Sequence, residues 1–189
     1  MTVLFLVSDI FGRTKALEAI SERLSNVAPD IRIIDPYQGI DHGFETEAHA
    51  YDYFINRVGL ETYQDILMDQ LTSSGPDMMI LIGFSVGASA IWAASDQPVF
   101  KRAKKAFCFY GSQIRHNTGI QPLFDIELIF PEQEPHFDVD ELIRNLNTKS
   151  RVTCSKAPGL HGFMNKLSPH FDPACYEKFI SYLKTSLIQ

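Results

Sequence analysis

The chain has 189 residues, of which 45% are hydrophobic and 21% charged, and its formal net charge is -6. This composition excludes a disordered, collagen-like or coiled-coil chain, and the length fits one globular domain spanning residues 1–189. The negative charge disfavours a nucleic acid or an anionic membrane surface as the main partner. Basic residues are densest at positions 101–105, and we expect that cluster in a solvated loop.

The cysteines and the apolar runs bear on the compartment. Three cysteines with no C-x-x-C spacing argue against a disulfide framework or a zinc site and favour a reducing compartment. The first apolar run, residues 3–7, has no basic flank and reaches Asp9 almost at once, so it is predicted to be a strand rather than a signal peptide. The longest run, residues 78–84, is too short to cross a bilayer. We therefore expect a soluble cytoplasmic protein.

Short apolar runs alternate with segments of helical period along nearly the whole chain. In chain order, the pattern predicts a strand at 3–7, a helix at 16–27, a strand at 31–36, a helix at 60–71, a strand at 78–84, a helix at 86–94, strands at 106–110 and 126–130, a helix at 139–146, a strand at 151–155 and a terminal helix at 173–187. Residues 37–59 show no clean period and are predicted to be a loop with one short helix at most. The alternation predicts a mostly parallel sheet with helices on both faces, and the run 78–84 is its predicted central strand.

A G-x-S-x-G pattern, Gly83-Phe84-Ser85-Val86-Gly87, lies where the most apolar strand meets a helix. A nucleophile raised above a sheet needs a sharp strand-to-helix turn, and small residues two positions before and after it prevent collisions there. We therefore predict that Ser85 is a nucleophile. The competing interpretation is a tight turn in a flavodoxin-like nucleotide binder, although no G-x-G-x-x-G follows the first strand.

A serine nucleophile needs a general base and an orienting carboxylate, in the chain order serine, acid, histidine for this architecture. His161 lies in a loop between the last predicted strand and the terminal helix, a position from which it reaches back over the carboxyl edge of the sheet. His136 and His170 are minor alternatives, whereas the histidines at positions 42 and 49 precede the serine and are excluded by that order.

The segment after the strand at 126–130 offers four candidates for the acid, Glu132, Glu134, Asp138 and Asp140. Because a loop has no fixed period, spacing does not choose among them.

Three motifs in order resemble those of the dienelactone hydrolase family of α/β-hydrolases: residues 8–12 (SDIFG), 83–87 (GFSVG) and 159–163 (GLHGF). Family members have an E-I-F-G turn after an early strand, a G-x-C/S-x-G elbow and a G-x-H-x-F loop. The resemblance covers essentially the entire chain. It implies a compact α/β-hydrolase fold with a mostly parallel sheet of about six strands, because the usual amino-terminal strands are missing.

The resemblance also implies roles for particular residues. The family's acid follows a strand in an F-G-x-x-D context, which places it at Glu134 when Phe130 is aligned with that phenylalanine. The oxyanion hole is expected from two backbone amides, those of Val86 after the nucleophile and of Ile10 in the early turn.

Two positions depart from the namesake enzymes, which have a cysteine nucleophile and an arginine four residues after the histidine. Ser85 indicates the esterase-like side of the family, and Asn165 beside Lys166 argues against dienelactone itself as the substrate. Asp9, Phe11, Asn165 and Lys166 are expected to contact the substrate.

The sequence thus predicts a serine hydrolase that cleaves a small ester or thioester. Such a reaction needs no organic cofactor and no metal, and the predicted partner is a small molecule rather than a nucleic acid or a membrane. The alternative is a catalytically silent α/β-hydrolase-fold protein used for binding or regulation, because folds host unrelated functions.

Overall fold

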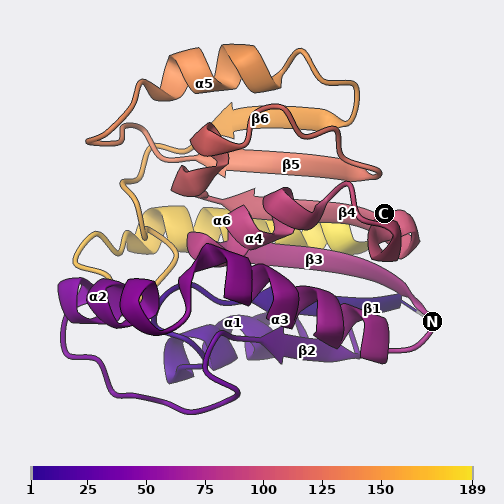
Figure 1. Cartoon of the computed structure of the whole chain (residues 1–189). Coiled ribbons are helices and arrows are strands. Elements are labelled where there is room, and N and C mark those ends of the chain that lie inside the picture. Colours follow the sequence, from indigo (N-terminus) through magenta and orange to yellow (C-terminus); the bar gives the residue numbers. More distant parts are fainter. Residues whose placement is uncertain (1, 189) are drawn as a thin grey trace.

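A six-stranded sheet with the order β2-β1-β3-β4-β5-β6 forms the centre of the fold, and every neighbouring pair of strands is parallel (Figure 1). The computed structural model describes residues 2–188. The strands are β1 (Thr2–Val7), β2 (Ile31–Ile34), β3 (Met78–Phe84), β4 (Ala103–Phe109), β5 (Asp125–Phe130) and β6 (Val152–Lys156). The prediction of a mostly parallel sheet of about six strands is confirmed, with β3 at an interior position.

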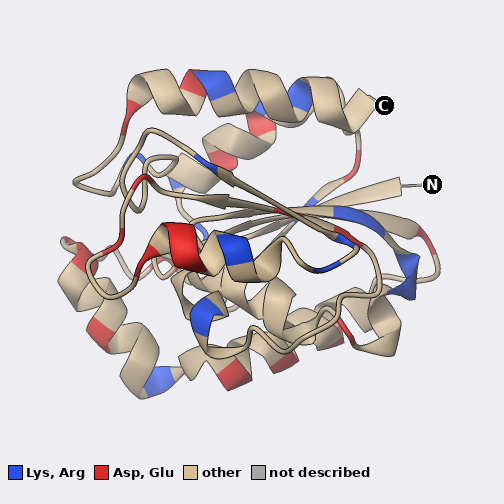
Figure 2. Cartoon of the chain, turned by 90° about the horizontal axis from the view of Figure 1, so that it is seen from above, with Lys and Arg blue, Asp and Glu red and all other residues tan. Residues whose placement is uncertain are grey.

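Helices cover both faces of this sheet, as the sequence predicts. They are α1 (Lys15–Leu24), α2 (Glu47–Arg57), α3 (Gly59–Ser73), α4 (Val86–Ala94), α5 (Val139–Leu146) and α6 (Pro173–Ile188), with 3₁₀ turns η1 (Pro98–Arg102) and η2 (Ser112–His116). Helices α1 and α6 pack on one face and α2 to α5 on the other, so that two hydrophobic cores flank the sheet. Figure 2 shows the sheet between the C-terminal helix on one side and the helices of the opposite layer.

Strand β1 illustrates how the two cores form. Its side chains alternate between the two faces, so that Phe5 and Val7 join the core beneath α3 and α4, while Leu4 and Leu6 join the core beneath α1 and α6. A strand covered on both faces needs apolar residues at every position, which is why the run shows no polar alternation.

The ends of the helices follow from local side chains. The Asp172 carboxylate accepts hydrogen bonds from the amides of Ala174 at 2.9 Å and Cys175 at 3.0 Å, and Pro173 is the first residue of α6.

None of the helices in residues 2–188 combines the length and the apolar character needed to cross a membrane.

Helix α2 is longer than the sequence predicts for residues 37–59. Ala50 and Phe54, four residues apart, are its buried positions, and Thr46 caps it by accepting a hydrogen bond from the His49 amide. Its outer face carries Tyr51 and Ile55, which are 48% and 49% exposed. Apolar residues on both faces hide the helical period, which explains why the pattern was ambiguous.

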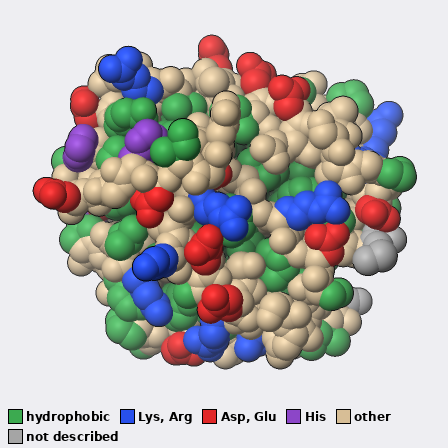
Figure 3. Space-filling view, turned by 90° about the horizontal axis from the view of Figure 1, so that it is seen from below, with side chains coloured by type: hydrophobic (Ala, Val, Ile, Leu, Met, Phe, Trp, Pro, Cys, Tyr) green, Lys and Arg blue, Asp and Glu red, His purple; other side chains and the backbone are tan. Residues whose placement is uncertain are grey.

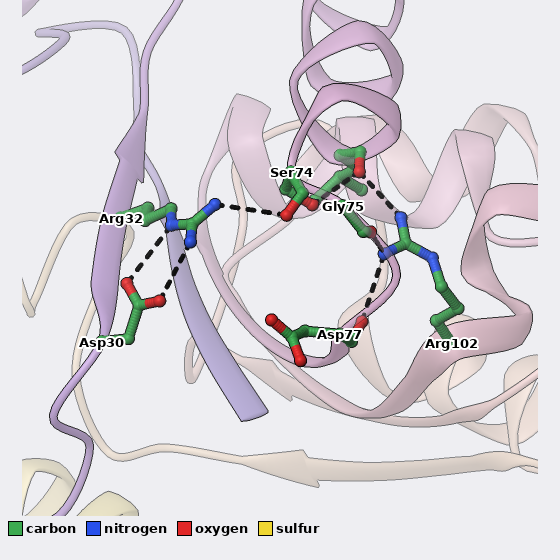
Figure 4. A network of polar contacts seen from close by, with 7 residues as sticks. Asp30, Arg32, Ser74, Gly75, Asp77 and Arg102 are labelled. Carbon is green, nitrogen blue, oxygen red and sulfur yellow. Dashed lines mark hydrogen bonds and ion pairs between the residues drawn. The ribbon is translucent and has the colours of Figure 1, made fainter. Parts of the chain in front are cut away.

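The expectation of a basic loop at 101–105 is wrong, because Lys101 and Arg102 end η1 and Lys104 and Lys105 belong to β4, although Lys101 and Lys104 are exposed. Arg102 ends η1 and donates to the carbonyl oxygens of Leu71 at 2.8 Å and Asp77 at 3.1 Å and to that of Gly75, which joins η1 to the turn between α3 and β3 (Figure 4). Lys105 lies within β4, where its ammonium is 3.0 Å from Glu127.

Charged side chains of both signs are mixed on the face of the molecule seen in Figure 3, where acidic and basic residues are interspersed.

Gly87 controls how closely α4 approaches β1, and its replacement tests this packing. A Cβ atom at Gly87 would lie 2.3 Å from the Ser8 carbonyl oxygen and 2.5 Å from that of Val7. Alanine normally stabilises a helix by about 0.5–1 kcal/mol relative to glycine, but here we expect Gly87→Ala to lower the free energy of unfolding by about 1–3 kcal/mol. Urea denaturation measures the change.

Gly119→Ala is the matched control for that experiment, because nothing lies within 4 Å of a Cβ atom built there. Its free energy of unfolding should stay within about 0.5 kcal/mol of the unmodified protein. A Gly87→Ala protein as stable as this control would show that the helix has room to move away.

Candidate active site

Ser85 lies between β3 and α4 at the carboxyl edge of the sheet, in a strained backbone conformation with φ 51° and ψ -113°. Its amide donates to the Phe109 carbonyl oxygen at 2.9 Å, and its own carbonyl accepts from the Ser89 amide at 3.0 Å, which begins α4. Gly83 has no room for a side chain, because a Cβ atom there would lie 2.8 Å from the Ala88 backbone. The turn therefore has the form that the G-x-S-x-G pattern predicts.

His161 reaches Ser85 from the loop between β6 and α6. Its Nε2 lies 2.9 Å from the Ser85 Oγ, and its ring packs on that of Tyr110 with 5.1 Å between the centroids. The turn after it is tight, because Gly162 has φ 88° and a Cβ atom there would meet the Ser168 side chain. The Asn165 amide donates to the Gly162 carbonyl at 2.8 Å and closes the turn.

Glu134 lies behind His161, with its Oε1 2.7 Å from the His161 Nδ1. The carboxylate is 5% exposed and the imidazole 23%, so the contact is shielded from water on the acid's side. The Glu132 amide donates to the Gly159 carbonyl at 2.9 Å and ties the two loops together. A carboxylate accepts from Nδ1–H, which leaves Nε2 free to accept the Ser85 hydroxyl proton.

The other predicted acids and bases have different partners. Asp138 caps α5, accepting from the amides of Asp140 at 2.8 Å and Glu141 at 3.1 Å. The Asp140 carboxylate lies 2.9 Å from the Lys156 ammonium. His170 Nδ1 lies 3.2 Å from the His161 carbonyl oxygen and not beside Ser85. Of the four candidate acids, the structure brings Glu134 to the imidazole.

The early turn that carries Ile10 lies beside this elbow, because β1 pairs with β3 in a register that places Val7 opposite Gly83. The Tyr37 hydroxyl donates to the Ile10 carbonyl oxygen at 2.7 Å. Gly12 has φ 78°, and its amide donates to the Asp9 carbonyl at 3.1 Å. Ile10 and Val86 therefore come from two fixed segments that leave the same edge of the sheet.

Asp9 is a buried carboxylate in this turn. Its Oδ1 accepts from the Phe11 amide at 2.9 Å, and its Oδ2 accepts from the Asn165 Nδ2 at 2.6 Å. Burial raises the pKa of Asp9 to about 6, against the opposing effects of these two donors. Lys166 is not part of this arrangement, because its ammonium lies 5.4 Å from the centre of the Tyr176 ring.

Three hollows lie around Asp9, Ser85 and His161. The Ser85 pocket, about 10 Å³, holds Ser85 and His161 and is lined by Asp9, Phe11, Glu47, Tyr110 and Asn165. An inner pocket shares Asp9, Tyr110 and Asn165 with it and adds Leu17, Phe84 and Met164. An outer hollow, about 550 Å³, is lined by Glu47, Glu134, His136, Leu160, His161 and His170. Within the part of the chain that the structure describes, no lysine or arginine lines any of the three.

Of the residues named above for the Ser85 pocket, sequence reasoning missed Tyr110 and Glu47. Tyr110 was assigned to the core of a strand, but β4 ends at Phe109 and Tyr110 follows with φ 43°. A signal for it exists, since an aromatic residue followed by Gly111 at the end of a strand marks a change of direction. Glu47 gave no such signal, because residues 37–59 were predicted to form a loop with one short helix at most, whose position the pattern did not give. Residues 2–188 contain no group of three or more His, Cys, Asp or Glu side chains placed to hold a metal ion.

The protonation of Asp9 gives a direct test of the site's electrostatics. In a ¹³C NMR titration, we expect the Asp9 carboxyl to titrate near pH 6. Asp138 is the internal control and should titrate below the ordinary aspartate range, because the amides of Glu141 and Asp140 lower its pKa. Because the folded-state pKa of Asp9 lies above its unfolded value, its contribution to the free energy of unfolding decreases as pH rises from about 4 to about 6. Asn165→Ala removes a donor and should raise the Asp9 pKa further; a titration of both carboxyls below pH 4 would contradict this description.

Comparison with known proteins identifies the fold. No protein-family model matches the chain. The uncharacterized protein YczH of Bacillus subtilis is 28% identical over 186 residues, which are 96% of this chain and 90% of that protein. A dienelactone hydrolase-like promiscuous phosphotriesterase from metagenomic libraries superposes with a TM-score of 0.68 at 12% identity, covering 99% of this chain and 85% of the other. The mouse alpha/beta hydrolase domain-containing protein 10 superposes with a TM-score of 0.66 at 9% identity, covering 98% of this chain and 89% of the other. The chain therefore has the α/β-hydrolase fold, in a form similar to that of dienelactone hydrolase-like proteins.

Proposed function

We propose that this protein is a serine hydrolase that cleaves a small carboxylic ester or thioester. One observation carries the proposal: Ser85 Oγ lies 2.9 Å from His161 Nε2, and His161 Nδ1 lies 2.7 Å from Glu134 Oε1. A serine in a strained turn, hydrogen-bonded to a histidine that a carboxylate orients, is the arrangement that activates a hydroxyl as a nucleophile. Solved structures of the same fold described as esterases, such as Est1E from Butyrivibrio proteoclasticus at a TM-score of 0.59 and 8% identity over 99% of this chain and 85% of that one, add support at the level of the fold.

In the proposed reaction, the Ser85 hydroxyl attacks the carbonyl carbon while His161 takes its proton. The amides of Val86 and Ile10 stabilise the negative charge that develops on the carbonyl oxygen. His161 then donates the proton to the leaving group, and an acyl-enzyme forms. Water, activated by the same imidazole, hydrolyses it. Glu134 holds the imidazole tautomer and stabilises the imidazolium without accepting the proton.

The sizes of the hollows suggest how a substrate lies. The Ser85 pocket is narrow, with a volume of about 10 Å³, whereas the outer hollow, about 550 Å³, has room for the larger part of a substrate. His161 lines both the Ser85 pocket and the outer hollow. This position suits the group that must protonate the leaving atom. We propose small substrates of this shape and, from the sequence, a cytoplasmic location.

A serine-reactive fluorophosphonate probe tests the nucleophile. We expect the unmodified protein to gain one probe mass and Ser85→Ala to gain none, because the other serine hydroxyls lack a paired base. Ser181→Ala, an exposed change on α6, is the matched control and should label normally. Labelling of Ser85→Ala would displace the assignment. An unmodified protein that neither labels nor hydrolyses p-nitrophenyl acetate would favour the catalytically silent binding protein.

Steady-state kinetics of Glu134→Gln tests the acid. An amide at this position no longer favours the tautomer with the proton on Nδ1, so kcat should fall by about 10³- to 10⁴-fold with a much smaller change in KM. Glu132→Gln, two residues away and exposed, should retain kcat within about twofold. The assignment is wrong if Glu134→Gln keeps near-normal turnover while Asp138→Asn or Asp140→Asn loses it.

A further inference from the structure

Tyr110 lines the Ser85 pocket and carries a buried hydroxyl that the proposed reaction does not use. Its side chain is 1% exposed, and its hydroxyl forms no hydrogen bond of ordinary geometry with any of residues 2–188. Tyr110 lines both the Ser85 pocket and the inner pocket. A buried hydroxyl without a partner is rare in folded proteins, and beside a reactive serine it points to a ligand that completes it.

The backbone of Tyr110 supports this interpretation independently. Its φ of 43° is unusual for an aromatic residue, and such strain persists where the surroundings impose it, often at ligand sites. The Tyr110 amide donates to the Ile129 carbonyl at 2.8 Å, and its ring lies 5.1 Å from that of Phe163 and 5.1 Å from that of His161. The strained turn thus holds the side chain against the catalytic imidazole.

The Tyr110 hydroxyl is a donor that lacks an acceptor. Burial raises its pKa well above the ordinary value, and the nearby Asp9 carboxylate raises it further, so the phenol keeps its proton. The Met164 amide lowers this pKa, as a donor toward the phenolic oxygen does. Because an amide N–H is a donor, it offers no acceptor for the phenolic proton.

Asp9 supplies an acceptor in the same two pockets. Its Oδ1 accepts one hydrogen bond, from the Phe11 amide, and its Oδ2 accepts one, from the Asn165 side chain. A carboxylate oxygen can accept two hydrogen bonds, so each oxygen has capacity for a further donor. Glu47 adds a second carboxylate to the Ser85 pocket, and no basic side chain in the described residues balances the two.

We infer, on the basis of the proposed function, that the site recognises a short acyl group carrying a hydroxyl, which accepts a hydrogen bond from Tyr110 and donates one to Asp9. An alkyl group would satisfy neither residue. A carboxylate would accept from Tyr110 but would face the negative charges of Asp9 and Glu47. An ammonium would donate to Asp9 but offers no acceptor for the Tyr110 proton. A hydroxyl is both donor and acceptor and meets both needs.

A matched set of methyl esters tests this specificity, with acid release followed in a pH-stat at pH 7.5. The set contains methyl butyrate, methyl 2-hydroxybutyrate, methyl 3-hydroxybutyrate, methyl 3-aminobutyrate and monomethyl succinate. We expect at least one hydroxybutyrate to have a kcat/KM about 10-fold or more above that of butyrate, because a buried site built for a hydroxyl disfavours the analogue that lacks it. The succinate half-ester should be the poorest substrate.

Tyr110→Phe removes only the hydroxyl and should bring the ratio of kcat/KM for hydroxybutyrate over butyrate close to one. Tyr182→Phe is the control, because its hydroxyl bonds Glu127 at 2.6 Å on the exposed side of α6, and it should keep the ratio of the unmodified protein. Thermal unfolding of both variants verifies that each is folded before the ratios are compared.

The outcomes separate this inference from the proposed function. If neither p-nitrophenyl acetate nor any methyl ester is hydrolysed, the proposed function fails and the inference fails with it. If p-nitrophenyl acetate is hydrolysed but neither hydroxybutyrate exceeds butyrate, the hydrolase stands and the inference is overturned, with a bound water as the partner of Tyr110. Retention of the hydroxyl preference in Tyr110→Phe would overturn it as well.

Discussion

The backbone of Ser85 is held in a left-handed conformation that costs a non-glycine residue about 1–3 kcal/mol. The surrounding packing compensates for this cost. Helix α4 lies directly on the ends of β1 and β3, because Gly83 and Gly87 leave backbone in contact with backbone. The rest of the site depends on this close approach, because it fixes the position of Ser85 at the carboxyl edge of the sheet. His161 and the early turn at residues 8–12 must reach the serine from that edge.

Two buried tyrosines fix the early turn against that elbow. The Tyr63 hydroxyl, on α3, donates its single proton between the carbonyl oxygens of Ser8 and Ile34, at 3.0 and 3.1 Å, at the ends of β1 and β2. The Tyr37 hydroxyl bonds the Ile10 carbonyl. Buried hydroxyls normally find such partners; Tyr63 connects α3, and Tyr37 connects the turn after β2, to the segment of residues 8–12 that carries the Ile10 amide. The Tyr110 hydroxyl differs from both in having no such partner among residues 2–188.

The electrostatics of the pocket follow from what the fold buries. Asp9 lies under the turn with two donors for its two oxygens, and desolvation still raises its pKa to about 6. Lys166, which neighbours Asn165 in sequence, lies instead over the Tyr176 ring, because consecutive residues in this turn point in different directions. The pockets around Ser85 are therefore lined by carboxylates and imidazoles, with no lysine or arginine among the described lining residues.

The sequence by itself determined the order of strands and helices, the elbow at Ser85 and the position of His161, because these depend on local patterns: apolar period, helix caps and glycine spacing around a turn. It also placed four candidate acids after β5, and the family resemblance indicated Glu134 among them. Only the tertiary structure decided which carboxylate reaches the imidazole, because Asp138 is used by a helix end and Asp140 by Lys156. It also decided that α2 forms and that Tyr110 enters the pocket, since both depend on contacts between segments far apart in the chain, which a local pattern does not encode.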